Sequence, residues 1–142
     1  MGQGRAIDWD RRLVQYLADV EGRRFKWGEF DCCLFAAGAV DTQTGSCFLE
    51  NFWHTYDTRF GACRIIRDTL GRKGDLADLF NHLLGAETAI NPKLAQRGDP
   101  VVVRFGDTQA AGINYGEHSL VMSDYGWIAT PAKVEAAWSL NL

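Results

Sequence analysis

The sequence predicts an α+β fold, with helices in the first part of the chain and an antiparallel sheet in the second. Two observations support this prediction. Apolar residues recur at helical spacing over residues 7–85, whereas short β-branched and apolar segments separated by Gly, Asp or Pro fill residues 100–140. Helices followed by strands favour an α+β domain over the alternating units of a parallel sheet. At 142 residues the chain is long enough for one domain, and we expect residues 1–142 to form it.

The helical part is expected to contain four helices. One segment is apolar on every side and rich in small residues, which is typical of a helix buried in the core. The other three have one apolar face, and their first turns follow residues that commonly cap helices. In chain order the expected helices are residues 7–20, residues 32–40, a helix begun by Thr58, and a helix capped by Asp75 that ends at Gly85.

The remaining segments are expected to be loops and strands. Residues 42–56 read as a loop that holds the aromatic side chains of Phe52, Trp53 and Tyr56, and residues 86–96 as a connector that contains Pro92. Beyond this connector, turn-forming residues separate four or five short segments, which predict an antiparallel sheet of as many strands. The expected strands are residues 100–105, 110–115, 118–122, 126–129 and 136–140.

Composition and charge exclude several classes of function. The net charge of −3 and the scattered basic residues argue against a nucleic-acid-binding protein. No apolar run approaches the ~18 residues needed to span a bilayer, and the N-terminus has no signal-peptide core, so we expect a protein made in the bacterial cytoplasm. The four cysteines lack metal-binding spacing and a histidine cluster, so no metal or other cofactor is expected. Cys47 and Cys63 are expected to be small buried side chains.

One stretch, residues 25–37, organises the chain and suggests a reactive cysteine. Trp27 and Gly28 form a turn, and Asp31 is placed to cap the helix that starts with Cys32. The free N–H groups and the dipole at a helix N-terminus favour the thiolate form of a cysteine there. Cys32 is therefore a candidate nucleophile. In an unreactive protein the same residue, like the cysteine that follows it, would be a small core side chain.

Three stretches of the chain resemble the NlpC-type papain-like family of cell-wall peptidases and amidases. Residues 27–32, Trp-Gly-Glu-Phe-Asp-Cys, are similar to the family's Trp-Gly…Phe-Asp-Cys signature. Residues 97–102, Arg-Gly-Asp-Pro-Val-Val, are similar to its Gly-Asp-(Leu/Val)-Val strand entry, and residues 110–116 occupy the place of its His-Val-Gly-Ile-Tyr-x-Gly strand. Residues 56–58 and the closing residues 136–138 further resemble the compact branch encoded among tail genes of bacteriophages and gene-transfer agents.

The resemblance implies a papain-like fold in which the cysteine helix packs on an antiparallel sheet. It places Cys32 on the family's nucleophile. The histidine that serves the family as general base corresponds to Ala110 here, so the departure from the family falls on the chemistry. A third polar residue normally lies on the next strand, where Ser123 is the weak candidate. The Trp-Gly turn and the capping Asp31 order the start of the helix whether or not the site is active.

A replacement base has to bring an imidazole within hydrogen-bond reach of the sulfur. His118 is the histidine nearest in sequence to Ala110, but a hairpin about residues 116–117 would separate them by roughly 15 Å or more at about 3.3 Å per residue. It is therefore a weak candidate base, and an exposed turn residue is the alternative. His54, in the aromatic loop, could fold toward the sulfur, and His82 is expected on the solvated face of its helix.

An intact signature without a base favours a catalytically degenerate papain-like domain that acts as a structural or assembly protein of a phage-type tail tip or baseplate. Its partners would be other tail proteins, and its location a virion tail or tail-like particle. The alternative is an active tail-associated murein peptidase or amidase, in which Cys32 forms an acyl-enzyme with a stem peptide of peptidoglycan. A third hypothesis is a pocket that binds a wall peptide or a partner's chain end without cleaving it.

Overall fold

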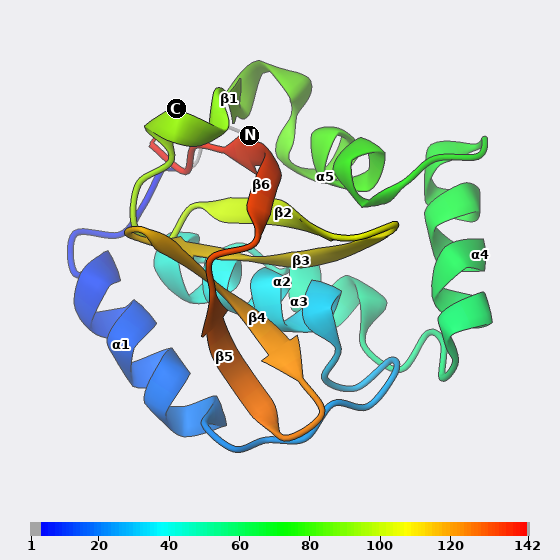
Figure 1. The fold of residues 1–142 in the computed structure, drawn as a ribbon, viewed down its shortest axis with the longest axis horizontal. Helices are drawn as coiled ribbons and strands as arrows, with labels where there is room; N and C mark the ends of the chain where they lie inside the picture. Colours follow the sequence, from blue (N-terminus) through cyan, green and yellow to red (C-terminus); the bar gives the residue numbers. More distant parts are fainter. Residues whose placement is uncertain (1–3, 142) are drawn as a thin grey trace.

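A computed structural model describes residues 4–141 and has the expected α+β architecture (Figure 1). The helices come first and most of the strands follow. The helices are α1 (Trp9–Val20), α2 (Cys32–Thr44), α3 (Phe48–Phe52), α4 (Arg59–Leu70) and α5 (Leu76–Leu84), with the short 3-10 helices η1 (Ala86–Thr88) and η2 (Pro92–Leu94). The strands are β1 (Ala89–Ile90), β2 (Pro100–Phe105), β3 (Thr108–Tyr115), β4 (His118–Ser123), β5 (Gly126–Thr130) and β6 (Lys133–Trp138).

The strands form one antiparallel sheet in the order β1-β6-β2-β3-β4-β5. The described residues thus contain six strands, so the expectation of four or five was wrong. The additional strand is β1, whose two residues pair with Trp138 and Ala137 of β6. A two-residue strand is too short to show an alternating pattern, so only its pairing reveals it. The last strand was also misplaced, because β6 begins at Lys133 and not at residue 136.

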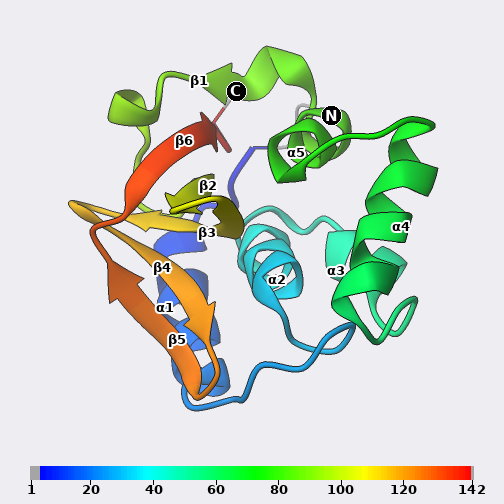
Figure 2. The same ribbon diagram turned by 45° about the vertical axis from the view of Figure 1, so that its right-hand side comes forward.

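The central helix is α2, which lies between the sheet on one side and α3 and α4 on the other (Figure 2). Most of its apolar residues are buried, as predicted, and Phe35 and Ala39 have no exposed surface. The small residues allow the close approach that the sequence indicated. At Gly38 an added Cβ would lie 2.4 Å from the Tyr16 hydroxyl of α1, which donates a hydrogen bond of 2.8 Å to the carbonyl oxygen of Phe35.

The C-terminal end of α2 extends past the predicted end at Val40. The helix continues to Thr44 and is terminated by Gly45 in the left-handed conformation. The extension was missed because polar residues interrupt the apolar pattern, yet Gln43 is fully buried and donates hydrogen bonds to the carbonyl oxygens of Ala39 and Gly98. Residues 42–56 are therefore not a single loop, since they also contain α3.

A buried polar cluster, which we call the Asp99 cluster, holds this end of α2 against both ends of the described chain. The Asp99 carboxylate forms a 2.8 Å ion pair with Arg5 and accepts backbone N–H bonds from Gln96 and Leu140. Arg5 also donates to the Gln43 side-chain oxygen at 2.9 Å. The Gly-Asp stretch that resembles a family strand entry therefore serves as a structural anchor in this chain.

Helix α4 packs only loosely on the rest of the molecule. No residue of α4 is buried, and Phe60 is 75% exposed although the sequence placed it on an apolar face. Thr58 caps the helix as predicted, accepting a hydrogen bond from the N–H of Gly61. Figure 1 shows α4 at the edge of the molecule, away from the sheet. None of the described helices is long and apolar enough to cross a membrane.

Candidate functional site

The start of α2 is built around the side chain of Asp31, which is fully buried. One carboxylate oxygen caps the helix by accepting a 3.0 Å hydrogen bond from the N–H of Leu34. The other oxygen accepts the N–H of Gly28 at 3.0 Å and the hydroxyl of Tyr56. The predicted capping role of Asp31 is confirmed. With all these donors satisfied, the carboxylate orders the turn and the helix start together.

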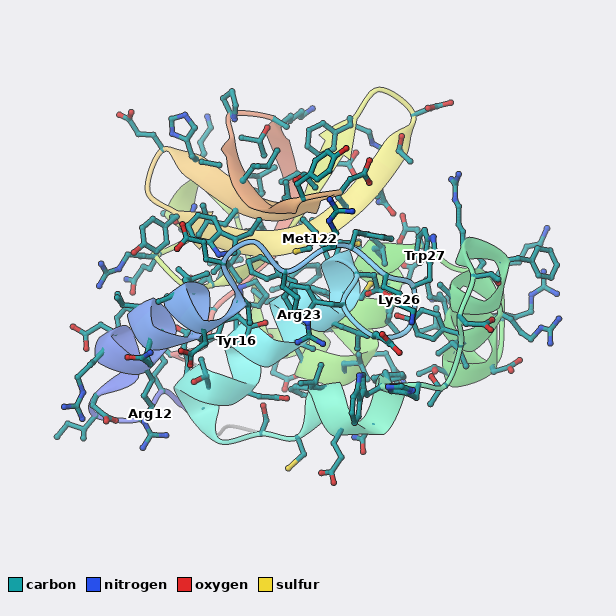
Figure 3. All side chains as sticks on the ribbon, turned by 90° about the horizontal axis from the view of Figure 1, so that it is seen from below. Arg12, Tyr16, Arg23, Lys26, Trp27 and Met122 are labelled. Carbon is teal, nitrogen blue, oxygen red and sulfur yellow. The ribbon has the colours of Figure 1, made fainter. Side chains whose placement is uncertain are left out.

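Gly28 is required where it stands, for two reasons. Its φ of +78° is in the left-handed region, which residues with a Cβ avoid. An added Cβ would also lie 1.6 Å from the carbonyl oxygen of Tyr56, because residues 54–57 pack directly on this turn. The N–H of His54 donates a 2.7 Å hydrogen bond to the carbonyl oxygen of Gly28. Figure 3 shows the neighbouring Trp27 between α2 and α4.

Tyr56 is the site residue that sequence reasoning missed. Its hydroxyl reaches Asp31 across 25 residues of sequence, and its ring lines the cavity beside Cys32. Burial first, and then the neighbouring Asp31 charge, raise the pKa of the Tyr56 phenol, so it remains a proton donor to the carboxylate. The only sequence signal was an aromatic residue ahead of a capping Thr58, which does not indicate which side chain it meets.

Cys32 and Cys33 form an interacting pair at the first turn of α2, and both are partly exposed. The thiol of Cys33 donates to the Cys32 sulfur, which is the main cause that lowers the pKa of Cys32. Burial opposes this shift, whereas backbone hydrogen bonds from Ala111 and Cys33 add to it. The pKa of Cys33 is raised well above its ordinary value, first by the same hydrogen bond and then by burial. Cys32 is therefore the more nucleophilic thiol of the pair.

Both thiols open into an apolar cavity of about 570 Å³ between α2, α3, α4 and α5. Its walls carry mainly aliphatic and aromatic side chains, including Ile66 of α4 and Leu79 of α5. Polar groups such as Arg59 and Gln109 lie along its margin, where the Gln109 side chain also accepts a hydrogen bond from the N–H of Leu76. A cavity of this size and character is typical of a small-molecule or side-chain binding site.

None of the three histidines, all of which lie in the described part of the chain, lines this cavity. His118 is exposed and pairs with Tyr115 beside the β3–β4 turn, as the predicted hairpin required. His82 is exposed on α5, also as expected. The backbone of His54 does pack against the turn before Cys32, but its half-exposed ring lies 3.7 Å from Glu29 and against Trp53. Nothing brings an imidazole to the sulfur.

The strand position opposite Cys32 differs from the one that the resemblance indicated. Ala111, with no exposed surface, packs in the cluster that includes both thiols, whereas Ala110 packs on the opposite face of the sheet with Val101 and Val103. Ala110, which corresponds in sequence to the family's base, therefore does not face the sulfur. Alternation along a strand decides this, because neighbouring residues point to opposite faces. An alanine stands at either position, so the lack of a base is unchanged.

Ser123 does not complete a catalytic site. Its hydroxyl donates a 2.7 Å hydrogen bond to the carbonyl oxygen of Gly126 and accepts the N–H of Tyr125. These bonds close the β4–β5 turn, so Ser123 is occupied in local structure. It is not among the residues that line the Cys32 cavity.

The other two cysteines are not buried, so the prediction of small core side chains was wrong. Cys47 and Cys63 are exposed, because each lies on a short or loosely packed element rather than in the core. Cys63 nevertheless borders the same cavity as Cys32, from its α4 side. No group of three or more potential metal ligands occurs among residues 4–141.

The model of one known family covers almost the whole chain. A family model described as "Domain of unknown function (DUF6950)" matches residues 4–140. The chain belongs to this family. No curated protein matches it.

Proposed function

We propose that this DUF6950 protein is a papain-like domain of NlpC type that has lost its hydrolytic chemistry and serves as a structural or assembly protein of a phage-type tail tip or baseplate. One observation carries the loss of chemistry: Cys32 heads a capped, buried helix as a nucleophile would, yet no imidazole lines its cavity. The family resemblance of residues 27–32 and 97–102 supports the fold type, and that of residues 56–58 and 136–138 supports the tail location. The partners are other tail proteins.

The lack of a base has a direct chemical consequence. Amide hydrolysis needs a group that takes the thiol proton and later protonates the leaving amine, and histidine usually does both. The lowered pKa of Cys32 supplies part of the first requirement, but no residue of the cavity supplies the second. The start of α2 is instead retained as a scaffold, since Asp31, Gly28 and Tyr56 hold it rigidly.

The tail role is tested by deleting the gene from the element that encodes it and analysing the particles. We expect the protein as a stoichiometric component of purified tails, and defective tails after its deletion. Complementation with Cys32→Ala should restore normal tails, because the scaffold and not the sulfur is used. Tails that lack the protein and assemble normally after its deletion would contradict the proposal.

An active murein peptidase or amidase is the second candidate, and the lowered pKa of Cys32 favours it. In that case Cys32 attacks an amide carbonyl of the stem peptide, and a loop movement has to bring His54 to the sulfur. Digestion of purified peptidoglycan by wild type and by Cys32→Ala decides between the two. We expect no soluble fragments from either protein, whereas release by wild type alone would establish the peptidase.

A further inference from the structure

We propose that Cys32 accepts an acyl group from a long-chain acyl thioester and keeps it as a stable thioester, with the acyl chain in the apolar cavity beside α2; this rests on the part of the proposed function that leaves Cys32 without a general base. Three features support it: the chemistry of the cavity walls, the position of the sulfur in the wall, and the composition of the site around the sulfur.

The cavity suits an acyl chain better than a polar peptide. About 570 Å³ is within the size range of sites that enclose small ligands. Its walls are mainly apolar, and their aliphatic part comprises Ile66 and Ala62 from α4, Leu79 and Leu83 from α5, and Val40 from α2. Helix α4 has no fully buried residue, and its inner face, with Ile66 packed against the core, is only partly covered. An acyl chain would provide that cover, and its transfer from water is favourable in proportion to the apolar area buried.

The sulfur lies where the head of such a chain would react. Cys32 shares the cavity with the aliphatic wall residues and is partly exposed to it. The sulfur belongs to the first residue of α2, where the backbone N–H groups have no partner within the helix, and Ala111 of β3 packs in the same cluster. Donors at this place can also stabilise the negative charge that develops on a carbonyl oxygen under attack. The site therefore has a nucleophile and charge stabilisation without a histidine.

The proposed step needs no general acid. The Cys32 thiolate attacks the carbonyl carbon of the donor thioester, a new C–S bond forms, and the C–S bond to the donor thiol breaks. The donor leaves as a thiolate and takes its proton from water, so no redox partner is needed. A thiolate leaves without prior protonation, whereas an amine does not, and this difference selects thioesters over amides at a site without imidazole.

The lack of a histidine also keeps the acyl group on Cys32. Release of the acyl group requires water to be activated against the thioester, and no histidine lines the cavity to act as a base for it. Apolar walls around the chain also exclude water from the carbonyl. Cys32 would thus carry one acyl group and not turn over. The loaded protein would have a filled cavity and a firmly packed α4.

The test is incubation of the full chain with palmitoyl-coenzyme A and, separately, acetyl-coenzyme A, followed by intact-mass and peptide analysis. We expect one palmitoyl group per chain, on Cys32 and removable by hydroxylamine. Labelling of Cys32 should exceed that of Cys63 at least about tenfold, because Cys32 is the better nucleophile and the cavity binds the chain. Cys47→Ser is the control: it removes an exposed thiol that does not line the cavity and should leave labelling unchanged, whereas Cys32→Ser should abolish it.

A second variant tests the cavity itself. Ala62 faces the cavity from α4, so Ala62→Trp should fill the space without disturbing the core and should slow palmitoyl transfer at least about tenfold, while acetyl transfer stays within about twofold. Three results would overturn the proposal: no adduct on Cys32, equal labelling of Cys32 and Cys63, or equal rates with both acyl donors. Continued release of coenzyme A beyond one equivalent would instead overturn the proposed function, because it requires a working base.

Discussion

A buried carboxylate lies beside each end of α2, and the two carboxylates have different partners. At the C-terminal end, Asp99 pairs with Arg5 inside a closed cluster that joins both ends of the described chain. At the N-terminal end, Asp31 binds only neutral donors and lies beside a cavity that contains two thiols. The first arrangement pairs the two buried charges with each other, although one nitrogen of the Arg5 guanidinium is buried without a hydrogen-bond partner. At the second, hydrogen bonds fix the start of the helix, whereas the two thiols open into the cavity, as in a ligand-binding site.

Burial shifts the pKa values of both charged groups in the Asp99 cluster. It raises the pKa of Asp99 although Arg5 and two backbone N–H groups oppose the shift, and it lowers the pKa of Arg5. Both directions mean that desolvation exceeds the mutual attraction of the two charges. Such a pair specifies the arrangement of the chain ends more than it adds stability. Removing one partner, however, leaves the other charge buried alone.

The largest predicted loss of stability is therefore in the Asp99 cluster. Asp99→Ala should lower the free energy of unfolding by about 4 kcal/mol, since it leaves the Arg5 guanidinium buried without a counter-charge. Urea unfolding followed by circular dichroism measures this loss. Glu135→Ala, which breaks the bidentate pair with Arg104 at the surface, is the control and should cost no more than about 1 kcal/mol. Similar losses for the two variants would remove the distinction between a buried and a surface pair.

The next largest loss of stability is expected at the turn that precedes α2. Gly28→Ala should cost about 3 kcal/mol, because the new Cβ is strained at φ +78° and collides with the Tyr56 carbonyl oxygen. Gly71→Ala is the matched control, with φ +72° but nothing within 4 Å, and should cost about 1 kcal/mol. The difference in urea midpoints measures the packing of residues 54–57 on the turn. Equal midpoints would show that this packing is absent in solution.

A smaller loss is expected from Tyr56→Phe. The variant keeps the ring in the cavity wall but removes the hydroxyl that donates to Asp31, for a cost of about 2 kcal/mol typical of a bond to a charged acceptor. Hydrogen exchange should accelerate at the amide of His54, which binds the Gly28 carbonyl oxygen. Tyr125→Phe, at an exposed ring, should change neither quantity. Unchanged exchange at His54 in Tyr56→Phe would separate Tyr56 from the turn.

The smallest effect concerns the thiol pair. Cys33→Ala removes the group that is the main cause of the lowered pKa of Cys32, so that pKa should rise toward its ordinary value. The pH dependence of iodoacetamide alkylation at Cys32, followed by mass spectrometry, measures the shift. The alkylation midpoint should therefore move to higher pH in Cys33→Ala and stay in place in Cys63→Ala. A midpoint that does not move would assign the effect to the helix end alone.

Local signals in the sequence predicted much of the fold. The caps Asp31, Thr58 and Asp75 all accept backbone hydrogen bonds in the structure, and Gly85 ends α5 as expected. A cap depends on residues three positions apart, so its signal lies within one turn of chain. The misses at Gln43 and β1 have the opposite origin. Their hydrogen bonds reach across the molecule, to Gly98 and to β6, where no local pattern records them.

By itself the sequence determined the order of helices and strands, the place of Cys32 at a capped helix start, and the positions where histidines are absent. Only the tertiary structure decided that Ala111 and not Ala110 faces the sulfur, that Tyr56 completes the Asp31 site, and that an apolar cavity opens beside Cys32. The physical reason is distance along the chain. Helix caps and turns are set by neighbouring residues, whereas a cavity and its chemistry are set by side chains that packing alone brings together.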